Sequence, residues 1–132
     1  MAMIYAALTG INPSLIAEIK MGRPRTLELT SAHNIITLSE VNPDSLIFMT
    51  STDMEDLAPG DGGILVHVIG LSISMKRVVE YANPLFYEER ERTSARVQIR
   101  YMCSSTIKLV ESRGTGQATF VDAVKAQQYC AL

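Results

Sequence analysis

Residues 60–71 read GDGGILVHVIGL and give the clearest strand signal in the chain. The apolar run from Ile64 to Ile69 is short and follows a glycine cluster, which indicates a β-strand entered from a tight connection. Gly70 interrupts the same apolar pattern, and a glycine at such a position indicates a bulge or a sharp bend before Leu71. Strands with corners of this kind are typical of small closed or half-closed sheets.

Further segments on either side also have strand patterns. Residues 26–30 alternate, with two leucines on one face and Glu28 on the other, as in a half-buried strand. Residues 46–49 are all apolar between turn signals, which indicates a strand buried on both faces. Three more strands are predicted at 2–8, 95–103 and 106–110.

Helix signals are fewer and shorter. Asn12 suits the N-cap and Pro13 the first helical position, so a helix is predicted over Asn12–Met21 with Gly22 as its stop. The same Asn-Pro chemistry predicts a short charged helix over Phe86–Arg92. A last helix is predicted from Thr119 to about Tyr129.

Two segments are less regular. Residues 52–55 have the spacing of a capping box, which predicts one or two helical turns before Pro59. Residues 32–38 fit either a strand or a helical turn. With six or seven strands, two or three short helices and no linker, we predict a single α+β domain over residues 1–132. The expected architecture is a small curled mixed β-barrel, and a doubly wound parallel sheet is disfavoured.

Composition favours a cytoplasmic protein. Of 132 residues, 47% are hydrophobic and 20% are charged, and no export signal or long apolar run is present, so we expect no membrane contact. Two reduced thiols at Cys103 and Cys130 are favoured over a disulfide between them. Only two histidines occur, which argues against a His-rich metal site. We expect no metal and no cofactor.

Charge is distributed unevenly along the chain. Residues 31–63 contain six acidic and no basic residues, whereas residues 76–113 contain eight basic and five acidic ones. The overall pI of about 5.6 argues against a dedicated duplex-binding protein. A local basic face built from residues 76–113 stays open.

Two groups of residues suggest an anion-binding surface. Gly22, Arg25 and Glu28 lie where the first helix passes into a strand, and arginine offers paired donors to phosphate or carboxylate. Arg96 and Arg100 share a strand face, which would suit a phosphate backbone. In the alternative interpretation these arginines only solvate a strand edge or pair with nearby glutamates.

No catalytic signature occurs in the sequence, so histidines are the remaining candidates for chemistry. His33 follows a predicted strand in a polar segment and is a candidate ligand contact. His67 lies mid-strand, opposite the valines, and is either a hydrogen-bonded core residue or a pocket residue. Residues 60–63 could hold a phosphate on backbone amides, although a turn is the commoner role of such a cluster.

Two family resemblances follow from particular motifs. The chain resembles a small archaeal family of uncharacterised proteins, a domain of unknown function, and this resemblance implies no activity. The stretches that carry it are Ala7–Ile11, Ser31–Asn34, Phe48–Ser51 and Gly60–Ile64. More distantly, it resembles ASCH domains of the PUA-like superfamily, small β-barrels of which several are linked to RNA. Their GxKxxExR signature is matched by Gly22, Arg25 and Glu28 with one inserted residue, and Thr30 replaces its final arginine.

These observations predict a non-catalytic RNA- or nucleotide-binding module. The expected ligand contacts are Gly22, Arg25, Glu28, His33, Arg96 and Arg100. The alternative is a small enzyme, a hydrolase acting on a modified nucleotide or polar metabolite. It would need two of Glu28, His33 and His67 at one cavity to act as an acid and base pair.

Overall fold

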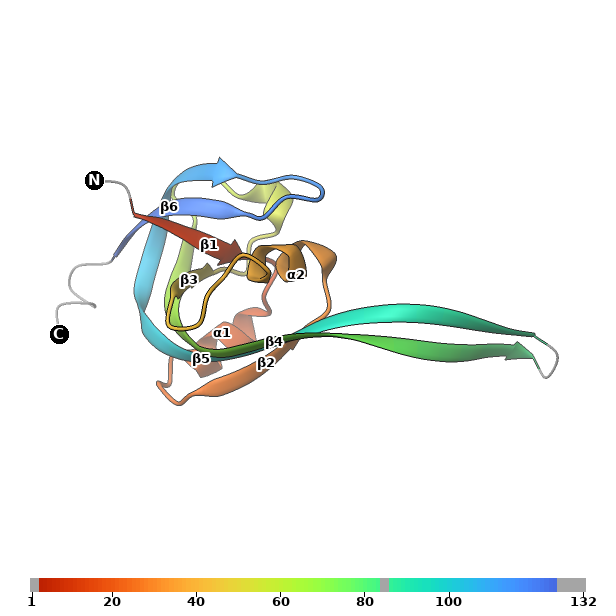
Figure 1. Ribbon diagram of the computed structural model, residues 1–132. Coiled ribbons are helices and arrows are strands. Elements are labelled where there is room, and N and C mark those ends of the chain that lie inside the picture. Colours follow the sequence, from red (N-terminus) through yellow and green to blue (C-terminus); the bar gives the residue numbers. More distant parts are fainter. Residues whose placement is uncertain (1–2, 84–85, 126–132) are drawn as a thin grey trace.

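A computed structural model describes residues 3–83 and 86–125, with the backbone alone for 76–91. Strands dominate it, and two short α-helices lie between the first three of them (Figure 1). The elements are β1 (Ile4–Leu8), α1 (Pro13–Ile19), β2 (Arg25–Leu29), α2 (Ala32–Leu38), β3 (Leu46–Met49), the 3-10 helix η1 (Met54–Asp56), β4 (Gly62–Asn83), β5 (Phe86–Ser112) and β6 (Phe120–Lys125). The predicted mixed sheet accompanied by short helices is confirmed.

The six strands form one sheet that closes on itself. Their order is β2-β5-β4-β3-β1-β6, and β6 also pairs with β5, so five strands form a ring and β2 is added at its edge. Only the pairing of β1 with β3 is parallel among the described strands. The topology excludes a doubly wound parallel sheet.

The longest strands, β4 and β5, form a hairpin that extends beyond the ring as an arm (Figure 1). Their register shifts between Val68 and Gly70, which confirms the predicted bulge. The predicted helix over 86–92 is wrong, because these residues continue β5 in register with β4. Pairing along the arm satisfies backbone groups that a short isolated helix would leave exposed at both ends.

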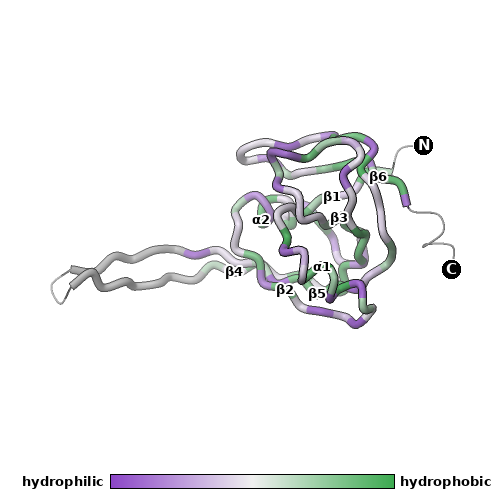
Figure 2. The backbone as a smooth tube through the Cα atoms, turned by 180° about the vertical axis from the view of Figure 1, so that it is seen from behind, coloured by the Kyte–Doolittle hydropathy of each residue, from purple (hydrophilic) through white to green (hydrophobic). Residues whose placement is uncertain are grey.

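Hydrophobic side chains fill both faces of the central strands. Phe48 and Leu65 point into the ring, where they meet residues from all five of its strands. Ile47 and Met49 point to the other face, which α1, α2 and β2 cover. Residues 47–49 are fully buried, so the predicted strand with two buried faces is confirmed. Figure 2 shows hydrophobic segments gathered in the body of the molecule.

The first helix begins as predicted and ends at Ile19, two residues before the predicted Met21. Asn12 Oδ1 accepts a hydrogen bond from the Ser14 amide at 2.9 Å, and Pro13 occupies the first helical position. Gly22 follows with a φ of 91°, a conformation that glycine adopts without strain. The ambiguous residues 32–38 are helical and form α2.

Three other expectations are corrected. Residues 120–125 form β6 and not a helix, because they close the ring between β1 and β5; the rest of the predicted helix lies outside the described residues. Residues 52–55 do not form a capping box, since Asp53 is the N-cap of η1 and makes no side-chain capping bond. Cys103 is buried and disulfide-bonded, whereas a free thiol was expected. The prediction for Cys130 lies outside the described residues.

Candidate functional site

The β2–β5 pairing fixes where the predicted motif residues lie. Glu28 is opposite Arg96 in the register, and Arg25 is opposite the buried Ile99. Directly opposed residues share a face, so Arg25 and Glu28 point to opposite sides of the sheet, as their spacing predicts. The motif residues therefore do not form one cluster.

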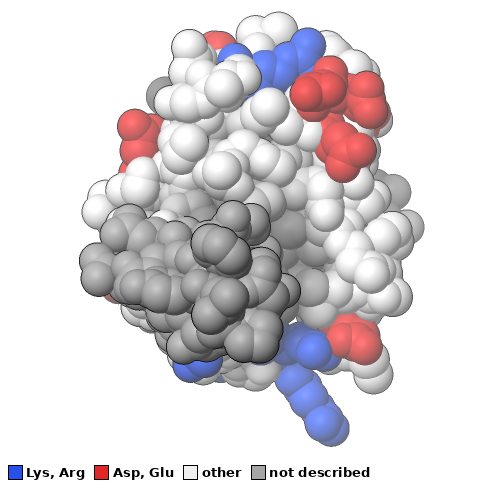
Figure 3. All heavy atoms as spheres, turned by 90° about the vertical axis from the view of Figure 1, so that its right-hand side faces the viewer, with Lys and Arg blue, Asp and Glu red and all other residues white. Residues whose placement is uncertain are grey.

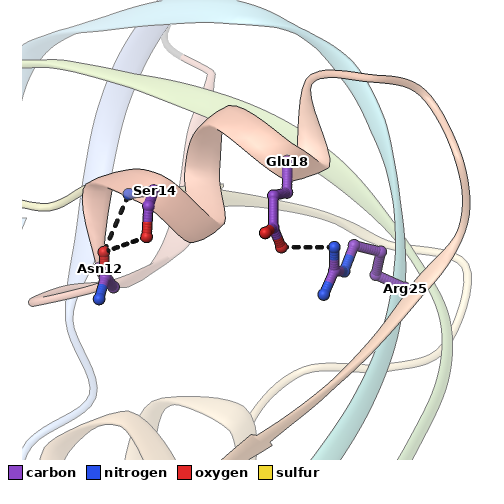
Figure 4. A network of polar contacts seen from close by, with 4 residues as sticks. All are labelled: Asn12, Ser14, Glu18 and Arg25. Carbon is purple, nitrogen blue, oxygen red and sulfur yellow. Dashed lines mark hydrogen bonds and ion pairs between the residues drawn. The ribbon is translucent and has the colours of Figure 1, made fainter.

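Arg25 lies on the helix side of the sheet. Its guanidinium Nη1 is 2.5 Å from Glu18 Oε2 of α1 (Figure 4). Gly22 lies in the exposed connection between α1 and β2, and its Cβ position is open to solvent. This ion pair joins α1 to β2 across the connection, and both of its side chains are partly exposed.

Arg96 and Arg100 lie together on the opposite side. Residues 95–100 alternate strictly between buried and exposed, which places Arg96, Gln98 and Arg100 on one exposed face. On β4, His67 is opposite Arg100, and its Nε2 lies 3.6 Å from Asp44 Oδ1. We call Glu28, His67, Arg96, Gln98 and Arg100 the polar sheet face.

Opposite charges accompany the arginines on this surface. Glu28 Oε2 is 4.0 Å from Arg96 Nη2, and both side chains are more than half exposed. On the face drawn in Figure 3, basic and acidic side chains form small separate groups and no broad basic patch appears among the described residues. Arg96 and Arg100 are the two arginines of the polar sheet face, so they are its candidates for a phosphate contact.

His33 lies elsewhere, on α2 and not in a loop. It lines a cavity of about 270 Å³ with Asp53, Met54 and Glu55. Within the described part of the chain, no group of three or more His, Cys, Asp or Glu residues could hold a metal ion. Glu28 and His67 lie on the polar sheet face, on strands β2 and β4 that β5 separates, whereas His33 lines a different surface.

A buried amide holds α2 in place. Asn34 Oδ1 accepts a hydrogen bond from the Thr9 amide at 3.0 Å, and Asn34 Nδ2 donates to the Thr9 carbonyl at 2.9 Å. The side chain thereby extends the backbone pairing beyond β1. Sequence reasoning missed this role, although the pattern of an asparagine among apolar helix residues was a usable signal.

A second cavity, which sequence reasoning did not find, lies between α1 and the ring. Its volume is about 380 Å³, within the range of small-molecule sites. Serine and threonine hydroxyls, a glycine pair, one lysine and a few apolar groups line it, and we call it the hydroxyl pocket. Its lining residues are Pro13, Ile16, Lys20, Ser51, Gly62, Gly63, Ile64, Ser104, Ser105 and Thr106.

The two glycines of this pocket differ in what requires them. A Cβ at Gly63 would lie 2.4 Å from the Met49 carbonyl oxygen and 2.5 Å from Phe48 Cζ, so the approach of β3 excludes a side chain there. A Cβ at Gly62 would meet nothing within 4 Å. Packing therefore explains Gly63 and leaves Gly62 unexplained.

Comparison with known proteins places the chain in a family. Residues 3–121 match the family described as protein of unknown function, DUF473. The chain belongs to this family. This DUF473 chain is also 34% identical over 95 residues to an uncharacterised protein of the archaeon Methanocaldococcus jannaschii. The match covers 72% of this chain and spans 59% of the relative's length. The predicted resemblance to an uncharacterised archaeal family is confirmed.

Among the helices that the structure describes, none is long and apolar enough to cross a membrane.

Proposed function

We propose that this DUF473 chain is a non-catalytic RNA- or nucleotide-binding domain of PUA-like type, with RNA phosphates bound along the polar sheet face. One observation carries the proposal. Arg96 and Arg100 present two exposed guanidinium groups on the same face of one strand, with Gln98 between them. The closed ring of strands with helices packed against it is consistent with a PUA-like barrel.

The spacing suits an extended phosphate chain. Residues four apart on one strand lie about 13 Å apart, since each residue advances the strand by about 3.3 Å. Guanidinium groups at that separation can contact two different phosphates of a single strand. Gln98 and His67 add polar groups between and beside them.

Glu28 does not prevent this use of Arg96. The ion pair between them is exposed and at the 4.0 Å limit of contact, so it contributes at most about 1 kcal/mol. A phosphate can therefore replace Glu28 as the partner of Arg96. Arg25 is not part of the proposed surface, because it faces α1 and pairs with Glu18.

Salt dependence of binding tests the proposal. Two phosphate contacts on single-stranded RNA predict a log–log slope of affinity against salt of about −1.4. The double variant Arg96→Ala/Arg100→Ala should bind far more weakly, with a slope close to zero. Arg23→Ala removes an exposed arginine outside this face and is the matched control.

Fluorescence anisotropy with labelled oligonucleotides at several salt concentrations measures affinity and slope together. Circular dichroism checks that each variant is folded. Equal binding by the wild type and the double variant would overturn the proposal. So would an absence of RNA binding by the wild type at low salt.

A further inference from the structure

The hydroxyl pocket combines groups that suit an anion. Lys20 contributes an ammonium group, and the side-chain hydroxyls of Ser51 and Thr106, both exposed residues, make no hydrogen bond to any described residue. No carboxylate lines the cavity. Ammonium and hydroxyl groups together donate several hydrogen bonds to the oxygens of one phosphate.

The same pocket has an apolar side. Pro13, Ile16 and Lys20 are spaced along one face of α1, so the helix presents two apolar residues beside its lysine. Ile64 adds a buried apolar residue from β4. A ligand with a phosphate at one end and a flat apolar ring at the other would match both parts.

Gly62 gives a further observation in favour of a ligand, independent of the donor groups and of the apolar side. Gly62 is the first residue of β4, and neither a positive φ nor a close neighbour requires a glycine there. Gly62 lies opposite Thr106 in the register, and because it has no side chain its backbone is exposed in the pocket wall. A glycine allows a ligand to approach the backbone closely.

We infer that the hydroxyl pocket binds a small phosphate monoester, with Lys20 and the free hydroxyls holding the phosphate and Gly62 leaving the space it occupies. This site is separate from the polar sheet face and does not depend on the function proposed above. The phosphate can belong to a free metabolite or to the 5′ end of an RNA strand, because the recognised chemistry is the same.

Isothermal titration calorimetry with the full chain tests the inference. The probes are inorganic phosphate, the four nucleoside 5′-monophosphates, the corresponding nucleosides, and one short oligonucleotide with and without a 5′-phosphate. We expect at least one monoester to bind and its nucleoside not to bind. Preference for the 5′-phosphorylated oligonucleotide over the monophosphates would identify an RNA end as the source.

Matched variants locate the binding. Lys20→Gln should weaken monoester binding about tenfold or more, because it removes a charged donor. Lys108→Gln makes the same charge change on an exposed part of β5 outside the pocket and should bind like the wild type. Arg96→Ala/Arg100→Ala should also leave monoester binding unchanged, which separates this inference from the RNA proposal.

Gly62→Val fills the space and should abolish binding while the unfolding temperature of the free protein stays the same. Gly62→Ala is a smaller change that should weaken binding in part, and it keeps the test valid if the valine variant does not fold. Monoester binding that survives both Gly62 substitutions, or no monoester binding at millimolar concentration, would overturn the inference.

Discussion

At the scale of single residues, the buried polar side chains of this protein differ in how they are satisfied. Asn34 is 3% exposed and pairs with both backbone groups of Thr9, so it stabilises the contact between α2 and β1. The Tyr5 hydroxyl is buried and makes no hydrogen bond to the described residues. Burial, and secondarily the nearby Asp122 carboxylate, raise the pKa of Tyr5 above its ordinary value of 10.0.

This environment predicts an alkaline loss of stability that depends on Tyr5. Below about pH 10 the side chain is neutral in both states and its ionisation does not affect folding. Above that pH, Tyr5 loses its proton in the unfolded chain but keeps it in the folded protein. The free energy of unfolding therefore falls. Tyr5→Phe should remove this part of the fall and leave stability at pH 7 unchanged or up to about 1 kcal/mol higher.

Urea unfolding of both proteins at pH 8 and pH 11 measures the difference. Tyr101→Phe is the matched control, since its hydroxyl lies 3.2 Å from Ser104 Oγ and its side chain is only partly buried. A wild type and a Tyr5→Phe variant that lose equal stability between these pH values would contradict the assignment.

At the scale of the elements, the start of β4 is held tightly against β3. Gly63 lies where the β3 backbone and the Phe48 ring leave no room for a methyl group. Any side chain there must push β3 away or displace the Phe48 side chain from the core that the ring of strands encloses. Packing therefore requires a glycine at position 63, whereas position 62 lies on an open surface.

Alanine substitutions at the two positions should accordingly differ. Gly63→Ala should lower the free energy of unfolding by about 2 kcal/mol or more, as overpacked core sites commonly do. Gly62→Ala should be neutral or stabilising by up to about 1 kcal/mol. Chemical denaturation of both variants measures the difference. Equal destabilisation would contradict the close approach of β3 to Gly63.

Elements with a strong local signal were predictable from sequence. Asn12 and Pro13 specify the start of α1 through local capping chemistry. Residues 46–49 are apolar throughout, which indicates a strand buried on both faces. Residues 86–92 were mispredicted because their charges fit a solvated helix as well as an exposed strand. Pairing with a distant partner on β4 decided between them, and a local pattern does not contain that information.

In the candidate sites, too, local features were predictable from sequence and long-range features were not. The shared face of Arg96 and Arg100 follows from strand alternation alone and was predictable. Their separation from Arg25 depends on the β2–β5 pairing, and the hydroxyl pocket depends on where α1 packs against the ring. Both are long-range features, so the sequence identified side chains but not the surfaces that they form.

At the scale of the whole molecule, the ring and the arm have separate requirements. The ring uses β4 only from Ile64 to His67 in its pairing with β3, and β2 pairs with residues 95–99 of β5. Residues 74–83 of β4 and 86–94 of β5 form the arm, and their described pairings join these two strands alone. A two-stranded hairpin by itself is only marginally stable, so the arm should contribute little to the stability of the body.

Shortening the arm tests this independence. Met75 and Thr93 are partners in the register, so an Asn-Gly turn can replace residues 76–92 between them. The shortened chain should fold and lose at most a few degrees of unfolding temperature. Calorimetry on both proteins measures the change, and a shortened chain that fails to fold would show that the body depends on the arm.

The most direct test of the proposed function is an amide NMR titration of the full chain with single-stranded RNA. The account predicts chemical-shift changes at residues 96–100 of β5 and at His67, and these changes should disappear as salt is raised. Residues 62–64 and 104–106 of the hydroxyl pocket should respond to a nucleoside monophosphate instead. RNA-induced changes that avoid residues 96–100, or that persist at high salt, would contradict the claim that the polar sheet face binds RNA phosphates.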